Sequence, residues 1–254
     1  MPSREQNIAN WSQYDWHDRG DAWSTGFGSS SMLWFRTILP RIFFFLPARN
    51  VLEIAPGFGR VTAFLLEHCE RYTGVDITPK CVEACRERFL GVTKAEFVRN
   101  DGLSLDCVGD GSLDFAISWD SLVHAEPAVL EAYVRGLSAK LSPGGTAFLH
   151  HSNLGALRDP ATGELSVANP HWRDANMSAD LMRGFVGDAG LVLDAQELVQ
   201  WGAPAAIDCF SWFHRPRVGE APLPDADTLV HPSFEAEIGH SAWLWSNAGR
   251  ARRS

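Results

Sequence analysis

The chain has 254 residues, of which 45% are hydrophobic and 21% are charged, as in an ordinary soluble globular domain. Its formal net charge is −9 at pH 7. A surface this acidic repels phosphate backbones and anionic lipid, so we expect neither a nucleic acid nor a membrane as a partner. The five cysteines include no CxxC pair with metal spacing, and the N-terminus has no signal-peptide core. These features predict reduced thiols and a cytoplasmic protein.

The sequence predicts one domain without internal repeats. Its expected parts are an N-terminal cap or lid (residues 1–48), a Rossmann-like core (49–213) and a C-terminal loop and tail (214–254), all within a single domain of residues 1–254. In the cap, residues 29–45 have the pattern of a helix that Ser30 or Ser31 caps and Pro40 kinks. This apolar segment is interrupted by charges and is shorter than the roughly 20 residues of a membrane span.

From residue 50 onward, short apolar segments alternate with segments of helical period. The expected strands are residues 50–54, 72–76, 96–99, 113–119 and 146–150. The expected helices are residues 60–69, 79–89 and 126–141. Strands that alternate with helices of roughly 10–15 residues predict a doubly wound α/β sheet of mostly parallel strands.

The chain changes character after the fifth strand. A helix at residues 178–189 is followed by two strands, at 191–200 and 205–213, which predict an antiparallel hairpin that ends a seven-stranded sheet. Residues 215–232 contain four prolines and are expected to form a loose loop. The tail that ends in Arg250-Ala-Arg-Arg-Ser is expected to be mobile.

The most informative stretch is Val51-Leu-Glu-Ile-Ala-Pro-Gly-Phe-Gly-Arg60, in which a buried strand leads through a glycine turn into a helix. Glycine there lets the backbone approach a ligand closely. Ligands bind at the carboxyl ends of the strands in an open α/β sheet. Asp76 ends the second strand, where a carboxylate can accept hydrogen bonds from ribose hydroxyls. We therefore expect a cofactor that contains a nucleoside.

These residues resemble the class I S-adenosylmethionine-dependent methyltransferases, whose first motif is an acid followed by a glycine-rich turn, as in Glu53-Ile-Ala-Pro-Gly-Phe-Gly59. The resemblance covers about residues 50–213. It implies that the cofactor is S-adenosylmethionine and that its binding residues are Glu53, Ala55, Gly57, Gly59, Asp76, Ile77, Asp101, Gly102, Ser118 and Trp119.

Within that set, the resemblance assigns the methionine part of the cofactor to Gly57 and Gly59 and the ribose to Asp76. Asp101 is expected near the adenine amine, and Ser118 and Trp119 on the cofactor floor. Ala55 departs from the family, which has glycine there, and an alanine is tolerable if its φ is negative. A nicotinamide oxidoreductase would instead show G-x-G-x-x-G, a spacing that residues 55–60 do not fit.

The acceptor end of the sheet should carry a base, because an aliphatic hydroxyl is a poor nucleophile at neutral pH. Trp119-Asp120-Ser-Leu-Val-His124 follows the fourth strand, and His150-His151-Ser-Asn153 follows the fifth. Histidine titrates near pH 7 and also binds metals. We expect His151 or His124 to be the base and Asp120 to orient the acceptor or the base. The alternative for His150 is a strand-end side chain packed in the core.

Three segments narrow the resemblance to bacterial sugar and polysaccharide O-methyltransferases: residues 120–124, 150–153 and His171-Trp172-Arg173. The acceptor contacts that it implies are His150, Asn153, Trp172 and Arg173. Some relatives use Mg²⁺, and Asp120 with His151 would hold a metal here. The histidines replace the paired acids of those enzymes, and Mg²⁺ prefers oxygen ligands, so a histidine base without metal is the favoured mechanism.

The sequence thus predicts a methyltransferase that acts on a hydroxyl of a sugar or oligosaccharide. Two other interpretations remain open: an O- or N-methyltransferase for a non-sugar metabolite, and a non-catalytic cofactor-binding partner subunit. A homodimer is one possible assembly. An unfilled acceptor crevice with inward-facing histidines would favour the enzyme over the partner subunit.

Overall fold

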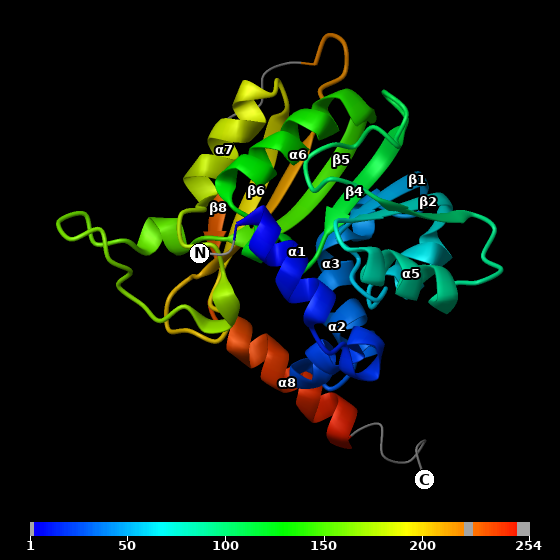
Figure 1. Ribbon diagram of the computed structural model, residues 1–254. Coiled ribbons are helices and arrows are strands. Elements are labelled where there is room, and N and C mark those ends of the chain that lie inside the picture. Colours follow the sequence, from blue (N-terminus) through cyan, green and yellow to red (C-terminus); the bar gives the residue numbers. More distant parts are fainter. Residues whose placement is uncertain (1–2, 221–225, 248–254) are drawn as a thin grey trace.

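The computed structural model describes residues 3–220 and 226–247, which build a mixed sheet of eight strands with helices on both faces (Figure 1). The strands are β1 (Ala48–Ile54), β2 (Cys69–Asp76), β3 (Ala95–Arg99), β4 (Leu113–Ser118), β5 (Leu141–Ser152), β6 (Val192–Val199), β7 (Asp208–His214) and β8 (Asp227–Val230). Their spatial order is β3-β2-β1-β4-β5-β7-β6-β8. The strand order reverses between β1 and β4, and ligands bind at such a switch point in open α/β sheets.

The predicted parallel core is confirmed, because β3, β2, β1, β4 and β5 pair in parallel. β7 pairs antiparallel with both β5 and β6, and β8 pairs parallel with β6. Asp208, the first residue of β7, lies opposite Ser152, the last residue of β5. The antiparallel strand therefore begins at the same edge of the sheet at which the parallel strands end.

Helices cover both faces. The longer ones are α1 (Arg4–Gln13), α5 (Pro79–Arg88), α6 (Pro127–Lys140), α7 (Ala179–Asp188) and α8 (Phe234–Asn247). The 11-residue η1 (His17–Phe27) is a kinked 3-10 segment. Shorter ones are α2 (Ser30–Leu33), η2 (Trp34–Ile38), α3 (Leu39–Ile42), η3 (Phe43–Phe45), α4 (Thr62–Leu65), η4 (Leu66–His68), η5 (Leu122–His124), η6 (Leu154–Leu157) and η7 (Pro170–Trp172). Within the described residues, no helix is both long and apolar enough to cross a membrane.

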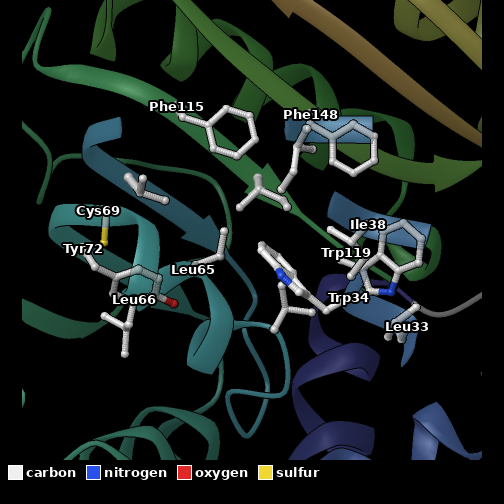
Figure 2. Close-up of a cluster of buried hydrophobic side chains, with 14 of the residues drawn as sticks. Leu33, Trp34, Ile38, Leu65, Leu66, Cys69, Tyr72, Phe115, Trp119 and Phe148 are labelled. Atoms are coloured by element: carbon white, nitrogen blue, oxygen red, sulfur yellow. The ribbon is translucent and has the colours of Figure 1, made fainter. Parts of the chain in front are cut away.

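Two hydrophobic clusters hold the layers together. One joins the N-terminal helices, α5 and α8 to one face of the sheet, and the other joins α6 and α7 to the opposite face. Figure 2 shows part of the first cluster, where Trp34 and Ile38 from the N-terminal helices lie near Trp119 at the end of β4. Phe115 and Phe148, from β4 and β5, complete this layer. The face of the sheet nearest the N-terminus is thus buried by residues outside the α/β alternation.

The predicted seven strands and the absence of a strand and a helix from the predicted C-terminal loop are wrong. Asp227–Val230 adds an eighth strand beside β6, and α8 follows it. Phe234 of α8 is fully buried among Phe27, Trp201 and Phe210. Burial of this side chain stabilises α8 through tertiary contacts. The prolines before the helix had led to the prediction of a loop. The tail from residue 248, expected to be mobile, lies outside the described residues.

Local boundaries also differ from expectation. Ser29, rather than Ser30 or Ser31, caps the apolar helix, because its hydroxyl accepts a hydrogen bond from the amide of Met32 at 3.2 Å. Before Pro40 the helix widens into π turns at Trp34–Ile38, as it can where a ring removes an N–H donor. The helix expected at residues 60–69 is shorter, because Cys69 already pairs with Ala48.

A buried ion cluster fastens α8 to the sheet. The guanidinium of Arg41 donates to both carboxylate oxygens of Glu197 on β6, each at 2.8 Å, and to Glu237 on α8 at 3.1 Å. Thr37 donates to the same Glu237 oxygen at 2.6 Å. The Arg41 guanidinium also lies over the rings of Phe210 and Phe234. The N-terminal helices, β6 and α8 therefore share one set of charged partners.

The packing of α8 predicts a large difference between two aromatic substitutions on that helix. Phe234→Ala should lower the free energy of unfolding by about 3 kcal/mol, since it empties a buried aromatic site. Trp243→Ala, at a side chain that is 59% exposed, should change it by less than about 0.5 kcal/mol. Urea denaturation of both variants measures the two values. Equal effects would contradict the packed position of α8.

Candidate functional site

A cavity of about 310 Å³ lies at the carboxyl edge of the parallel strands, a size within the range of small-molecule sites. Its wall includes the glycine turn after β1, the end of β2 and the loop after β4. Side chains from α1 and η1 complete it from the N-terminal side. The predicted cofactor end and the predicted acceptor end thus line one cavity.

The glycine turn after β1 contains a strained residue at Ala55, where the expected family pattern has glycine. Ala55 has φ +56°, so the expectation that alanine is tolerated through a negative φ is wrong. A left-handed alanine costs roughly 1 kcal/mol relative to glycine. Gly57 follows with φ +59°, and a Cβ atom built there would lie 2.9 Å from the ring of Trp16. The turn therefore brings bare backbone against the cavity.

Asp76 lies at the end of β2 and lines the cavity, as predicted. Its Oδ1 accepts hydrogen bonds from the amide and the hydroxyl of Thr78, at 2.9 and 3.0 Å, and its Oδ2 accepts a longer one from the amide of Gly57 at 3.3 Å. Burial raises the pKa of Asp76 to about 6, against these hydrogen bonds. The carboxylate is therefore ionised at pH 7 and keeps acceptor capacity toward a ligand.

Glu53 lies below the glycine turn and lines the cavity. Its Oε2 accepts hydrogen bonds from the hydroxyls of Thr62 at 2.6 Å and Tyr72 at 2.5 Å. Burial raises the pKa of Glu53 to about 7, although both hydroxyls oppose the shift. These bonds tie β1 to β2 and to the helix after the turn, so Glu53 holds the turn in shape.

The other predicted cofactor residues divide into two groups. Ile77, Gly102 and Trp119 line the cavity. Asp101 and Ser118 do not line it, which corrects the prediction for these two. Asp101 is exposed and caps the following turn through the amides of Leu103 and Ser104, and the Ser118 hydroxyl donates to the carbonyl of Ile54 at 2.8 Å.

Asp120 lines the acceptor side of the cavity in a left-handed conformation, with φ +56°. Its Oδ2 accepts a hydrogen bond from Nη2 of Arg60 at 2.9 Å. Both side chains are largely buried. Strained backbone of this kind collects at functional sites. Arg60, which the sequence analysis did not identify as a site residue, directly follows the glycine turn and so joins the two ends of the cavity.

His124 lines the cavity at the end of η5. Its Nδ1 lies 3.2 Å from the carbonyl oxygen of Trp172. A carbonyl only accepts, so Nδ1 carries the proton and Nε2 keeps its lone pair. Burial lowers the pKa of His124, which keeps the ring neutral at pH 7. The ring of Trp11 lies against it at 5.1 Å, and Asn7 donates to its carbonyl oxygen.

His151 does not line the cavity, so its predicted role as base is wrong on geometry. Both faces of the sheet are covered, and alternation along β5 turns His151 toward the α7 face and His150 toward the opposite face. His151 contacts the Ser152 carbonyl and the Ser211 hydroxyl, each at 2.9 Å. Burial lowers the pKa of His151 to about 4. It is a neutral, fully bonded core histidine.

His150 and Asn153 also lie outside the cavity, which corrects their predicted acceptor contacts. The Nδ1 of His150 accepts a hydrogen bond from the backbone amide of Asp120 at 3.1 Å, and its ring stacks on Trp201. Asn153 bonds to the carbonyl of Ala206 and the amide of Ala179. Both side chains therefore support the loops around the cavity instead of contacting its contents.

Of the two predicted acceptor contacts Trp172 and Arg173, only Arg173 lines the cavity. Trp172 is 64% exposed and does not line the cavity, so its predicted stacking on the acceptor is not supported. Arg173 is buried and lines the cavity. It donates to both oxygens of Asp208, from Nε at 2.6 Å and from Nη2 at 2.7 Å. Arg173 therefore reaches the cavity as one half of a buried, bidentate ion pair.

The metal alternative with Asp120 and His151 is wrong on geometry, since only the first of these residues reaches the cavity and Arg60 occupies its carboxylate. Among residues 3–220 and 226–247, no group of three or more histidine, cysteine or acidic side chains is arranged to hold a metal ion. The imidazole and charged groups that line this part of the cavity are His124, His171, the Arg60–Asp120 pair and the ion-paired Arg173.

Three further parts of the site were not identified from the sequence. Trp11 and Trp16 line the cavity from the cap, and His171 lines it from the loop before Arg173. Asp208 is a single charge inside the apolar run at residues 203–213, a signal that indicates a buried partner. The apolar neighbours of Asp208 in the sequence could have identified it as a buried charge. For Trp11 and Trp16, the sequence signal was only the high tryptophan content.

The residues present fit S-adenosylmethionine. Asp76 has free acceptor capacity for ribose hydroxyls, and the bare backbone at Gly57 allows close approach. Gly59 does not line the cavity, which corrects its predicted cofactor contact: a Cβ atom there would lie 2.5 Å from Phe89, so this glycine serves packing instead. Gly102 and Ile77 form the adjoining wall, where a Cβ atom on Gly102 would lie 2.6 Å from the Ile77 side chain. These residues would hold the cofactor with its ribose toward β2.

Comparisons with known proteins agree with this geometry. Residues 51–145 match the model of a methyltransferase domain family. An uncharacterised methyltransferase of Synechocystis sp. is 29% identical over 100 residues, which cover 39% of this chain and 45% of that protein. The chain thus spans less than half the length of the curated relatives that it matches.

Solved structures show the same fold. A SAM-dependent methyltransferase from Methanosarcina mazei aligns with a TM-score of 0.55 at 18% identity, covering 70% of this chain and 98% of that one. An S-adenosylmethionine-dependent methyltransferase from Mesorhizobium loti gives 0.55 at 17% identity, covering 72% and 98%. The matched residues 51–145 carry the glycine turn and Asp76, so this part of the chain is similar to a methyltransferase domain, and the solved structures show that the chain shares the fold of those proteins.

Proposed function

We propose that this protein is an S-adenosylmethionine-dependent O-methyltransferase that acts on a hydroxyl of a small, uncharged, sugar-like acceptor, with His124 as the base. The observation that carries the proposal is the neutral, cavity-lining His124, whose Nδ1–H is held by the Trp172 carbonyl. A base presented in this way into the cofactor cavity favours catalysis over a non-catalytic binding role.

The reaction needs a hydroxyl oxygen in line with the transferred methyl group and a proton acceptor beside it. Bound S-adenosylmethionine would supply an electrophilic methyl group on its sulfonium. An acceptor oxygen that took up this methyl group would leave the electron pair of the C–S bond on the cofactor sulfur, and Nε2 of His124 would take the hydroxyl proton. Asp120 orients acceptor hydroxyls through an oxygen that Arg60 does not occupy.

The charges around the cavity favour an uncharged acceptor. Its three arginines each have a carboxylate partner: Arg4 with Glu5 at 3.1 Å, Arg60 with Asp120 at 2.9 Å and Arg173 with Asp208 at 2.6 Å. A carboxylate or phosphate on the acceptor would have to compete with these partners. Hydroxyl groups instead find both donors and acceptors on the existing pairs.

The size and lining favour one sugar ring over an extended chain. A cavity of about 310 Å³ is at the small end for a site that serves both a cofactor and an acceptor, which favours a small acceptor, such as a monosaccharide or a terminal residue. Trp11, Trp23 and Trp201 line the cavity. Their apolar faces suit the C–H faces of a sugar, while Asp120 and His124 meet its hydroxyls. The non-sugar alternative is favoured by the same aromatic faces but leaves these polar groups without a purpose.

Cofactor binding is tested with S-adenosylhomocysteine, the demethylated product. We expect a dissociation constant in the micromolar range, on the order of −8 kcal/mol, by calorimetric titration. Asp76→Ala should weaken binding roughly 100-fold, because hydrogen bonds to a charged group are worth about 1.5–3 kcal/mol each. Asp110→Ala, at an exposed side chain far along the chain from the turn, is the control and should bind like wild type. Absence of binding to wild type would refute the proposal.

The acceptor class is tested by measuring S-adenosylhomocysteine release with a panel of uncharged monosaccharides, sugar acids, sugar phosphates and phenols. We expect turnover with one or more uncharged sugars and none with their charged counterparts. Turnover confined to phenols or to charged compounds would replace the sugar assignment while leaving the methyltransferase assignment intact.

The base is tested by His124→Gln with any acceptor that the panel provides. We expect kcat to fall roughly 100-fold, the usual size of base catalysis, with unchanged S-adenosylhomocysteine affinity. Because burial lowers the pKa of His124, the neutral form persists below the ordinary value of 6.5, and kcat/KM should decline only at lower pH. His151→Gln is the comparison and should retain wild-type turnover per folded molecule within about threefold. The reverse ranking of the two variants would assign the base to His151.

A further inference from the structure

We propose that Asp208 is the positioning residue of this site: one buried carboxylate that sets both the tautomer of His124 and the backbone of Asp120. The inference rests on the proposed function for its purpose. Its geometric content concerns only residues of this chain and can be tested without an acceptor.

Asp208 is fully buried at the start of β7, directly behind the cavity. Burial alone would raise its pKa, but the nearby His150 ring and the charge of Arg173 outweigh burial and hold the pKa below its ordinary value. The carboxylate is therefore a permanent anion in a dry environment. Arg173 and His150 approach it from different segments of the chain.

The first branch runs from Asp208 to His124. Arg173 is held by both oxygens of Asp208, and its backbone is held at both ends by Asn169, at 2.7 and 3.0 Å. These bonds fix the preceding residues in a strained shape, since His171 and Trp172 have φ of +60° and +55°. Such conformations cost roughly 1–3 kcal/mol each and persist only where the surroundings hold them.

The consequence of that shape is the direction of one carbonyl group. The Trp172 carbonyl points at Nδ1 of His124, at 3.2 Å. It selects the tautomer that leaves Nε2 as a proton acceptor in the cavity. The adjoining amide of Asp174 donates to the Val123 carbonyl at 2.8 Å, so the two loops are joined on both sides of this contact. The Arg173–Asp208 pair thus fixes the base without touching it.

The second branch runs from Asp208 to Asp120. The amide of Asp120 donates to Nδ1 of His150 at 3.1 Å, so the proton of that ring lies on Nε2. Nε2 lies 3.4 Å from Oδ2 of Asp208, a contact without hydrogen-bond geometry, and is otherwise buried without a partner, so the carboxylate charge is what stabilises the N–H on this side of the ring. The carboxylate therefore keeps the His150 tautomer that accepts the Asp120 amide. This hydrogen bond supports the left-handed backbone of Asp120 and presents its side chain to Arg60.

Asp208→Asn tests both branches at nearly constant volume. An amide NH₂ directed at His150 favours the opposite tautomer of that ring, which sets a donor against the Asp120 amide. Weaker anchoring of Arg173 releases the Trp172 carbonyl. The probe is the ¹⁵N-labelled full chain at pH 7.5, with histidine tautomers read from long-range proton–nitrogen correlations and the His124 signals assigned by their loss in His124→Gln.

In wild type we expect His124 to be protonated at Nδ1. In Asp208→Asn the ratio of its two tautomers should fall by about tenfold, the size of one lost hydrogen bond. Amide hydrogen exchange at Asp120 should accelerate by about tenfold as well. His150→Phe, which keeps an aromatic ring against Trp201, should accelerate exchange at Asp120 while the His124 tautomer stays unchanged.

Glu197→Gln is the matched control, because Glu197 belongs to a similarly buried arginine pair that lies away from the cavity. It should leave the His124 tautomer and the Asp120 amide unchanged, even if its unfolding free energy falls as much as that of Asp208→Asn. If Asp208→Asn does not fold, the double variant Arg173→Met with Asp208→Asn removes the uncompensated cation and should show the same two changes.

An unchanged His124 tautomer and an unchanged Asp120 amide in a folded Asp208 variant would overturn the inference. Equal changes in Glu197→Gln would overturn it too, since they would indicate general loosening. S-adenosylhomocysteine titration of the same samples separates the two proposals: wild type that fails to bind defeats the proposed function, whereas the tautomer and exchange results decide the role of Asp208 independently.

Discussion

Each buried carboxylate at the carboxyl edge of this sheet needs hydrogen-bond donors or a cation that offset the cost of burying its charge. The positions of these partners determine the arrangement of the site. Glu53 is held by two hydroxyl groups, Asp76 by amides and a threonine, and Asp208 by Arg173 and His150. An isolated carboxylate would be expelled or protonated in such surroundings. Because the partners come from different strands and loops, compensation of charge also fixes the relative positions of those segments. Glu53 and Asp76 line the ligand cavity, whereas Asp208 lies outside its lining and acts on the site through Arg173 and His150.

Compensation also shapes what the cavity can recognise. The arginines that reach its wall are neutralised within the chain, so attraction to an anionic acceptor is weak even though cations are near. Recognition then depends on hydrogen bonds whose donors and acceptors are already arranged, and on the faces of the tryptophans. This arrangement favours acceptors with several hydroxyl groups. Such a group also needs a base to become nucleophilic, and a neutral histidine in a dry wall is suited to that task.

The parallel core and the cofactor end were predictable from the sequence, because strand–helix alternation and a glycine turn are local signals. The cap, β8 and α8 were not, because their stability comes from contacts such as those of Phe234 and Arg41, which join residues far apart in the chain. The acceptor end lies between these cases. Asp120 and His124 were placed correctly at the cavity, whereas His151, Asn153 and Trp172 were not. Ala55 shows another limit, since a left-handed alanine gives no signal in the sequence.

The two adjacent histidines of β5 explain why residue type alone misdirected the search for a base. Successive side chains of a strand point to opposite faces of the sheet, and both faces are covered here. His150 and His151 are therefore buried in different layers, and neither lines the cavity. His124 does reach it because a short helical turn after β4 carries it beyond the sheet, where a single carbonyl contact satisfies one ring nitrogen and leaves the other available. Both ring nitrogens of His151 already contact protein groups, so neither is available to take a proton from an acceptor. The catalytic candidate therefore differs from the structural histidines in having a ring nitrogen available at the cavity, and residue type alone does not reveal this difference.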